Sequence, residues 1–509
     1  MKVFMRKRVV IIGAGFGGLS LGIRLQAAGL DVTIIDKQAY PGGQAQPLRQ
    51  GGYRFDMGPS LLTAPELIEE LFQIAGRERQ AYLSWEKLEP FYRVYFWDDT
   101  YIDYTDDPER MKAQLARFSH HDARSYKAFM ERSKAFYQAV IAEGLGRRPF
   151  TLRELLKFLP RAIRLEALRS SYSLAAKFFK DERSRFIFSF HPLFIGGDPF
   201  RAPAVYQMIP YLEKAGGVWY VRGGMHGLAQ GLARLFTDIG GQLLLQTEAQ
   251  RIKIRNGRVV AVQTPAGDLP ADMVVSNADF FHTYFRLLEP EALSSIVRWR
   301  LRQYQYGMSA FLIYAGLSRT YPEVLPHHTI VLGPRYRGLV KDIFRRKVLP
   351  SDFSLYLHAP SRTDSIWAPP GAESLYILSP VANLRSGISW SDAARRYQEA
   401  ILTSLQERLL DGLQGAVQTV SVYTPEDFLR DRNCTWGSPW GIEPRLIQTA
   451  NLRPPNKSYW VKGLYLVGTN THPGAGVPGV ILSAAATAQV ILQDLGLSNP
   501  ASTPVLIYE

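Results

Sequence analysis

The apolar and polar positions near the N-terminus predict a strand, a helix and a second strand. Residues 9–12 form a short apolar run, residues 19–25 have the composition of a helix, and residues 32–35 form another apolar run that stops at Asp36. Short apolar runs bounded by turn residues are typical of strands buried on both faces. The pattern therefore predicts the first unit of a parallel sheet, ending on a carboxylate.

Similar patterns return further along the chain. Apolar runs at 242–245 and 272–278, and a helix opening at 223–225, predict a continuation of the same fold, with a hairpin at Asn256-Gly257. A last run at 464–467 precedes a glycine loop and a helix of small residues at 483–488. Runs at 309–315 and 354–357 instead suggest an antiparallel sheet on one side of a substrate cavity.

Two glycine clusters follow predicted strands, at residues 13–18 and 474–479. In the first, Gly13 permits the turn, Gly15 leaves room for a pyrophosphate, and Gly18 allows close packing of helix on strand. The following helix offers unpaired N–H groups to phosphates, and Asp36 is placed to bind ribose hydroxyls. We expect both clusters to line one dinucleotide site, which makes the domain discontinuous.

A double glycine, Gly42-Gly43, comes soon after Asp36, and residues 51–60 contain a further glycine turn. This arrangement resembles the flavin-binding entry of the amine oxidase and carotenoid desaturase superfamily. That superfamily commonly has Arg after the double glycine, where this chain has Gln44. The resemblance is closest to the bacterial phytoene desaturases that use FAD, and it is carried by residues 188–200, 219–224, 327–329, 333–337, 352–360 and 464–488.

The resemblance implies FAD as the cofactor and a long apolar carotenoid as the substrate. It implies that the backbone of Ala249 holds the adenine and that the C-terminal element approaches the flavin ring. The expected cofactor-binding residues are Gly13, Gly15, Gly18, Asp36, Gly43, Gln44, Gly58, Pro59, Ala249, Gly468, Gly476 and Val477. The expected reaction converts phytoene toward lycopene by hydride transfer to the flavin, with a membrane quinone or oxygen as electron acceptor.

Two enzymatic alternatives share these motifs, and a third, non-enzymatic alternative shares the fold, although the complete phosphate loop with Asp36 and the second glycine cluster argue against it. A carotenoid isomerase uses a reduced flavin without net oxidation, a related desaturase acts on another carotenoid, and a carrier of the same fold binds isoprenoid tails without flavin. No catalytic base is assigned from the sequence, and His191, Asp198 and Arg169 are candidates only. His191 lies among phenylalanines, where a hydrogen-bonded core histidine is the commoner role.

The expected fold is α/β, with a Rossmann-like FAD-binding domain in three parts at 1–75, 216–285 and 456–497. A helical region for substrate and membrane contact is expected at 76–215, and an α+β substrate domain with an antiparallel sheet at 286–455. Residues 498–509 are expected to form a loose tail.

Composition narrows the chemistry. The chain has 509 residues, 46% of them hydrophobic, and a single cysteine, Cys434, which excludes an internal disulfide and a thiolate metal cage. The pairs His120-His121 and His327-His328 do not place both rings on one helical face, so no metal site is expected. The basic N-terminus resembles a secretory signal, but the glycines and Asp36 indicate a cofactor unit instead.

The net charge of +14 is concentrated in one segment. Residues 147–185 hold eleven Lys or Arg against four Asp or Glu, and no nucleic-acid motif accompanies them. Within the segment a basic stripe lies beside an apolar stripe around Pro160: Arg153, Lys157, Arg161 and Arg164, with Leu152, Leu155, Leu156, Leu159 and Ile163. Such a helix either lies on an anionic bilayer or covers the protein's own core. We expect peripheral attachment on the cytoplasmic side of a membrane.

Overall fold

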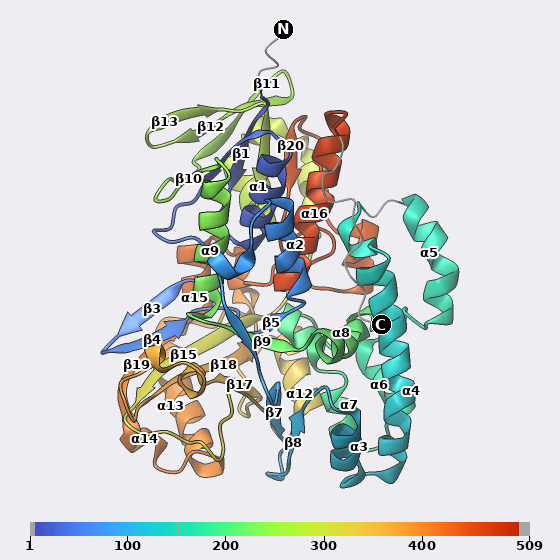
Figure 1. Ribbon diagram of the computed structural model, residues 1–509, viewed down its shortest axis with the longest axis vertical. Helices are drawn as coiled ribbons and strands as arrows, with labels where there is room; N and C mark the ends of the chain where they lie inside the picture. Colours follow the sequence, from blue (N-terminus) through green and yellow to red (C-terminus); the bar gives the residue numbers. More distant parts are fainter. Residues whose placement is uncertain (1–5, 150–151, 498–509) are drawn as a thin grey trace.

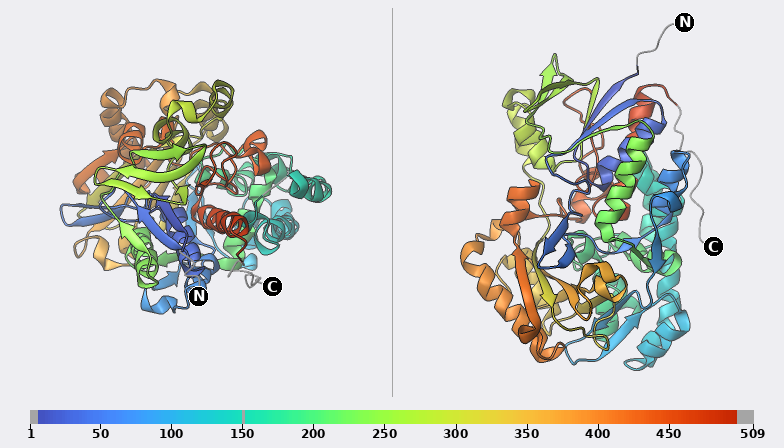
Figure 2. Two further views of the ribbon diagram at one scale, coloured as in Figure 1. Left: turned by 90° about the horizontal axis from the view of Figure 1, so that it is seen from above. Right: turned by 60° about the vertical axis from the view of Figure 1, so that its left-hand side comes forward.

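The computed structural model describes residues 6–149 and 152–497, so the expected tail lies outside the described residues. The chain forms an elongated molecule with a nucleotide-binding part at the top of Figure 1, a sheet-containing part below it and a group of helices along one side. The view from another side keeps the two parts stacked along the long axis (Figure 2).

The nucleotide-binding part is built on a five-stranded parallel sheet in the order β10-β2-β1-β14-β20. Its strands come from three separated stretches of the chain, which confirms the predicted discontinuity: β1 (Arg8–Ile12), β2 (Asp31–Ile35), β10 (Gln242–Leu244), β14 (Met273–Ser276) and β20 (Leu464–Leu466). The helices of this part are α1 (Phe16–Ala27), α2 (Glu66–Ile74), α9 (Gly224–Asp238) and α16 (Val477–Asp494).

Alternation along β1 explains how the sheet is covered. Val9 and Ile11 face a core shared with α1, α9 and α16, whereas Val10 and Ile12 face a second core. This second core is covered by a small antiparallel sheet of β11 (Arg251–Arg255), β12 (Arg258–Thr264) and β13 (Gly267–Pro270). The predicted hairpin at Asn256-Gly257 joins β11 to β12, and both residues have positive φ.

The lower part contains a seven-stranded sheet in the order β19-β15-β18-β17-β16-β7-β8. Its pairs are antiparallel except β16 with β7. The strands are β7 (Tyr92–Tyr95), β8 (Tyr101–Tyr104), β15 (Ser309–Leu317), β16 (His328–Val331), β17 (Leu355–His358), β18 (Glu373–Val381) and β19 (Val417–Tyr423). Its helices are α12 (Tyr336–Lys341), α13 (Trp390–Arg408), α14 (Leu413–Ala416) and α15 (Pro425–Arg432).

Two expected boundaries differ from the structure. The region 76–215 is not purely helical, because β7 and β8 extend the substrate sheet from within it. The strand β9 (Val218–Val221) lies within the stretch 216–285 that was assigned to the FAD-binding domain, but it pairs with β5 (Leu62–Thr63) and β6 (Trp85–Lys87) instead of joining the five-stranded sheet. These strands are short, so pairing partners far along the chain, rather than local pattern, decide where they belong. A further hairpin is formed by β3 (Pro47–Gln50) and β4 (Tyr53–Asp56).

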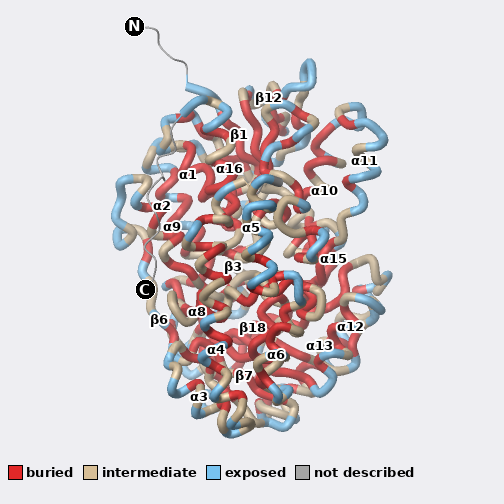
Figure 3. Tube along the Cα trace, turned by 90° about the vertical axis from the view of Figure 1, so that its right-hand side faces the viewer, coloured by how far each residue is buried: buried red, intermediate tan, exposed pale blue. Residues whose placement is uncertain are grey.

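The remaining helices flank the two sheets. Along one side of the molecule lie α3 (Pro108–Ala116), α4 (His120–Tyr137), α5 (Leu152–Arg164), α6 (Ser171–Phe178), α7 (Glu182–Ile187) and α8 (Ile209–Gly216). The short α10 (Phe280–His282) and α11 (Ser295–Leu301) follow β14. Figure 3 shows buried backbone through both sheets and an exposed outer surface on α5 and α11.

A buried ion triad ties the N-terminal unit to the helical region. Glu70 of α2 accepts from Arg24 of α1 at 3.2 Å and from Arg147 at 2.5 Å, and all three side chains are largely buried. Burial alone would raise the pKa of Glu70, but the two guanidinium groups lower it below its usual value. The carboxylate therefore balances two cations that would otherwise be buried without a partner.

Glu70→Gln should destabilise the protein by about 3–5 kcal/mol, because it leaves buried cations uncompensated. Glu69→Gln is the matched control: Glu69 pairs with Arg79 at a half-exposed position, where a pair contributes less than about 1 kcal/mol. Since the folded-state pKa of Glu70 is lowered, its stabilisation should be lost as the pH falls below the usual carboxyl value of 4.5. Chemical denaturation at several pH values measures both effects, and equal unfolding of the two variants at neutral pH would contradict the assignment.

Candidate functional site

The first glycine cluster and Gly468, which follows β20, meet at Asn277, the residue that follows β14. Its backbone N–H donates to Ile12 O at 2.8 Å and its Nδ2 donates to Gly13 O at 3.3 Å. A Cβ atom on Gly17 would lie 2.7 Å from Asn277 Oδ1, and one on Gly468 would lie 2.5 Å from the same atom. Only glycine fits at these positions, so one amide side chain fixes the distance between the N-terminal and C-terminal loops.

The first glycine loop has the roles expected from its spacing. Gly13 has a φ of +102°, and a Cβ on Gly18 would lie 2.0 Å from Gly13 O. Gly15 is the N-cap of α1 and has no side chain to cap the helix, so the first N–H groups of α1 remain available to a ligand. Gly15 also approaches the double glycine, since a Cβ on Gly43 would lie 3.0 Å from its Cα.

Asp36 holds this loop through its carboxylate. Its Oδ2 accepts from Ala14 N at 2.7 Å and its Oδ1 accepts from Gln38 N at 2.8 Å. Burial raises the pKa of Asp36, and the two backbone N–H groups act in the opposite direction by stabilising the ionised form. The carboxylate of Asp36 also borders a cavity, where its remaining lone pairs can accept hydrogen bonds from hydroxyl groups.

One cavity of about 650 Å³ joins the predicted site residues. It is bordered by ten of them: Gly13, Gly15, Asp36, Gly43, Gln44, Gly58, Pro59, Ala249, Gly476 and Val477. Gly18 and Gly468 do not border it but form the tight packing behind the two loops. Gly13 and Gly476 border the same cavity, so loops from near the two ends of the chain line one cavity.

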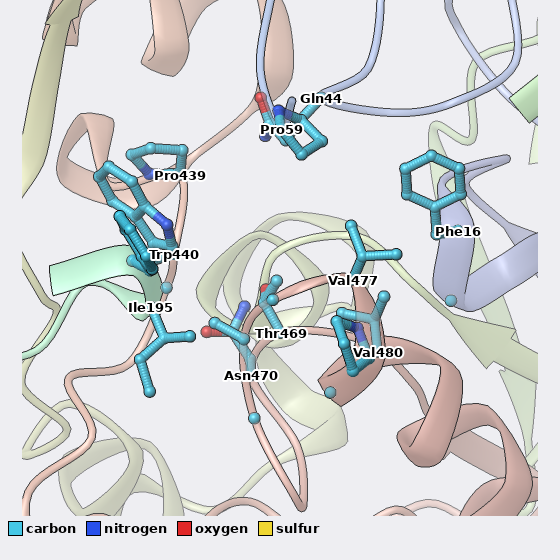
Figure 4. A pocket seen from close by; sticks show the side chains of 18 of the residues that line it. Phe16, Gln44, Pro59, Ile195, Pro439, Trp440, Thr469, Asn470, Val477 and Val480 are labelled. Carbon is cyan, nitrogen blue, oxygen red and sulfur yellow. The ribbon is translucent and has the colours of Figure 1, made fainter. Parts of the chain in front are cut away.

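Figure 4 shows the part of the cavity near the glycine loops. Gln44 and Pro59 lie on one side, with Val477, Val480, Thr469 and Asn470 opposite them and Trp440 closing a third side (Figure 4). Flat apolar surfaces on facing walls, with amide groups at the edge, suit an aromatic ring system.

The expected arginine after the double glycine is replaced here by Gln44. Its Nε2 donates to Cys434 Sγ at 3.1 Å, and burial raises the pKa of that thiol to about 12, so Cys434 stays protonated. Among the described residues that border the cavity, the lysine and arginine side chains are Lys37 and Arg432. These two cations are therefore the groups in this wall that can balance a pyrophosphate.

The cavity continues away from the glycine loops into an apolar arm. Its walls come from the seven-stranded sheet, from the segment around residue 193, and from α5, and they include Leu312, Ile330, Leu332, Leu355, Leu378, Phe190, Leu193, Phe194, Leu155, Phe158 and Leu159. Leu446 and Ala450 border it at the same end as α5. The lining side chains Leu159, Leu168 and Leu446 are exposed, which places the mouth of the cavity at the end beside α5. The cavity therefore extends from a polar cradle at Glu248 and Ala249 to an apolar mouth.

None of the three candidate bases borders this cavity. His191 is buried with its Nε2 3.3 Å from Tyr92 Oη, Asp198 accepts from Phe200 N at 2.8 Å, and Arg169 is an exposed partner of Glu166 at 2.5 Å. Burial raises the pKa of Asp198. The three side chains serve packing or surface pairing instead.

The polar residues of the cavity wall that sequence reasoning missed include Asn277, Ser60, Tyr356 and Glu213. Asn277 was seen only as the end of a strand, and Ser60 only as the residue after Gly58-Pro59. Glu213 accepts from Tyr92 Oη at 2.9 Å inside the apolar arm. Their positions depend on contacts more than a hundred residues apart, so the available signal was limited to their place after predicted strands and turns.

The adjacent histidines also differ from expectation. The prediction of no metal site considered helical faces, but His328 opens β16, and His327 and His328 lie with His358 of β17 in one buried cluster. His328 and His358 are paired across the antiparallel strands. A three-histidine cluster is thus present, although no helix builds it.

Comparison with known proteins agrees with this geometry. The model of the flavin-containing amine oxidoreductase family matches residues 16–492. The chain is 40% identical to a lycopene-forming phytoene desaturase of Paracoccus sp. over 96% of this chain and 98% of that protein. It is 43% identical to a neurosporene-forming phytoene desaturase of Rhodobacter capsulatus over 95% of this chain and 94% of that protein.

Solved structures show the same fold at low identity. An oxidoreductase from Methanosarcina mazei has a TM-score of 0.61 at 17% identity, covering 95% of this chain and 100% of that one. A putrescine oxidase bound to putrescine has a TM-score of 0.61 at 13% identity, covering 96% and 99%. From the family match and the full-length relatives together, the chain belongs to the flavin-containing amine oxidoreductases, in the group that includes the phytoene desaturases.

Proposed function

We propose that this protein is an FAD-dependent desaturase that introduces double bonds into phytoene toward lycopene. The observation that supports this most is the single cavity that runs from a dinucleotide cradle to an apolar mouth. Full-length relatives named as phytoene desaturases support the same substrate. Their names differ in the product, lycopene or neurosporene, so the number of steps is the finer part of the proposal.

FAD fits the polar half of the cavity. The N-terminus of α1 and the Gly15–Gly43 contact offer backbone to a pyrophosphate, Asp36 offers a carboxylate to a ribose, and Ala249 borders the far end. The space between Pro59 and Val477 suits the flavin ring (Figure 4). Lys37 and Arg432 would balance the charge of the pyrophosphate, because Gln44 replaces the arginine that the superfamily commonly has after the double glycine.

The bound flavin would supply an acceptor for a hydride from an allylic carbon, whose developing positive charge is delocalised over the polyene. The protein's own contribution is to hold the chain in register beside the ring and to exclude water. The cavity walls formed by the sheet and by α5 consist of apolar side chains. They suit a hydrocarbon chain, because neither the walls nor the chain has polar groups that would be left without hydrogen bonds.

A membrane surface is the proposed source of so apolar a substrate. At the mouth, α5 exposes Leu156 at 61% and Ile163 at 60%, and Ile447, the neighbour of the lining residue Leu446, is 65% exposed. A helix that only covered the protein's own core would have polar side chains at these solvent-exposed positions. Arg153 and Arg164 on the same helix have no ion pair among the described residues and can contact anionic headgroups.

Attachment would be peripheral, on the cytoplasmic side, with a membrane quinone or oxygen as the final electron acceptor. A membrane quinone is apolar like the substrate and can use the same mouth. Within the described residues, α16 is long and apolar enough to span a bilayer, but 67% of it is buried against the rest of the protein. It packs on α1 beside the cofactor cradle, so it serves as a core helix.

Expression in cells that accumulate phytoene tests the function directly. The protein should convert colourless phytoene into coloured carotenoids with more conjugated double bonds, detected by chromatography of extracted pigments. Unchanged phytoene in cells that contain the folded yellow protein would contradict the proposal. A purified protein without flavin would instead favour a carrier.

Gly15→Val should weaken retention of FAD, because the added methyl groups enter the narrow space between Asn277 and Gly43. Overpacking of this kind costs about 1–3 kcal/mol, which weakens binding roughly 10-fold to 100-fold. Gly415→Val is the control, since no atom lies within 4 Å of a Cβ at that position. The flavin-to-protein absorbance ratio after gel filtration measures the effect, and full occupancy in Gly15→Val would refute the placement of this loop.

Ile163→Glu should weaken binding to vesicles that contain anionic lipid roughly tenfold or more, because burial of such a side chain contributes about 1.5–3 kcal/mol. Ile296→Glu is the control, since Ile296 is 77% exposed but belongs to α11, none of whose residues borders the cavity. Cosedimentation with vesicles measures both variants. Equal losses in the two would show that α5 is no special contact.

A further inference from the structure

A chain of hydrogen-bonding side chains leads from the cavity wall to the surface. Ser60, which follows Pro59, and Tyr356 both border the cavity, and their hydroxyl oxygens are 2.5 Å apart. Tyr356 Oη lies 2.7 Å from His328 Nδ1. The chain therefore starts beside the wall that Pro59 and Gln44 form in Figure 4.

The histidine cluster continues the chain outward. His358 Nε2 lies 3.1 Å from His327 Nε2, and His327 Nδ1 lies 2.6 Å from Thr363 Oγ1. Thr363 is partly exposed, and the neighbouring Asp364 carboxylate accepts from Tyr220 Oη at 2.8 Å. The outer end of the cluster thus reaches solvent beside an acidic group.

One link is not a direct hydrogen bond. The rings of His328 and His358 are stacked with centroids 5.0 Å apart, and a nitrogen of each histidine lies within 4.8 Å of one on the others. His328 Nε2 and His358 Nδ1 are both buried without a partner among the described residues. A rotation of either ring, or one water molecule, closes a gap of this size.

One set of neutral tautomers satisfies every other contact with all donors pointing outward. If each hydroxyl donates outward, His328 carries its proton on Nε2, His358 on Nε2 and His327 on Nδ1. Every imidazole then accepts on its inner nitrogen and donates on its outer one. The two unpartnered atoms are then one donor and one acceptor, which complement each other across the gap.

We propose that Ser60, Tyr356, His328, His358, His327 and Thr363 form a relay that carries the proton released by desaturation from the cavity to solvent. The inference rests on the proposed function. Each new double bond requires the loss of a hydride to the bound flavin and of a proton from the neighbouring carbon. The electron pair of the C–H bond that loses the proton becomes the π bond. The proton passes to Ser60 Oγ, and each relay group donates its own proton to the next group toward solvent.

The electrostatics of the cluster agree with transient occupancy. Burial lowers the pKa of His327 to about 3 and places those of His328 and His358 well below the usual value. Burial also raises the pKa of Tyr356 well above its usual value. All four groups are therefore neutral at rest, and a proton that enters the chain is not trapped on any of them.

Tyr356→Phe tests the inner end, since it removes one hydroxyl and keeps the ring. It should lower kcat for phytoene supplied in phospholipid vesicles roughly 10²-fold, with KM and flavin content unchanged. Tyr397→Phe is the matched control: its hydroxyl also pairs with a serine, Ser379 at 2.9 Å, but outside the cavity. Equal turnover of the two variants, with an active wild type, would overturn the relay alone. A wild type that leaves phytoene unchanged would overturn the proposed function and the relay with it.

His358→Phe breaks the relay away from the cavity while filling the same space. If the groups act as one relay, kcat of His358→Phe should fall as far as kcat of Tyr356→Phe. The variant that carries both substitutions should then be no slower than either single variant. Multiplying effects would indicate separate structural damage and contradict the relay. Elemental analysis of the purified flavoprotein decides a further point: one equivalent of zinc per chain would make the cluster a metal site and overturn the proposal.

Discussion

The site depends on the close approach of three backbone segments around one asparagine. Asn277 leaves no room for a side chain at Gly17 or Gly468 and binds the carbonyl of Gly13. In the sheet, β14 lies between β1 and β20. Asn277, which follows β14, therefore lies between the loop that follows β1 and the loop that follows β20 and sets their spacing. A larger residue in any of these positions would separate the loops and widen the cradle that a dinucleotide must fill.

The same contact links the ends of the chain to everything inserted between them. The first sheet strand and the last are separated by more than four hundred residues, yet their loops border one cavity. The inserted segments form the apolar arm and its mouth, so cofactor and substrate share one continuous space. The buried Glu70, which holds Arg24 and Arg147, adds a second connection between the cradle and the helical side.

The polar groups named in the apolar arm are held by hydrogen bonds. Glu213 is held by Tyr92, and the Ser60–Tyr356 pair leads to the histidine cluster. In surroundings of low polarity a buried polar group without partners is costly, so such groups persist where hydrogen bonds satisfy them. The wall beside Pro59 is therefore the natural place for a proton to leave the apolar part of the cavity.

Glycine spacing, apolar runs and a terminal carboxylate act over short distances, so the strand–helix–strand unit at the N-terminus could be predicted from local pattern. Gly13, Gly15, Asp36 and the loop at Gly476 were expected together, and they border one cavity. The tertiary structure alone decided that β7 and β8 join the substrate sheet, that His327, His328 and His358 lie together, and that Asn277 is the spacer. These features arise from pairings between strands far apart in the chain, and local periodicity carries no information about which distant strand becomes the neighbour.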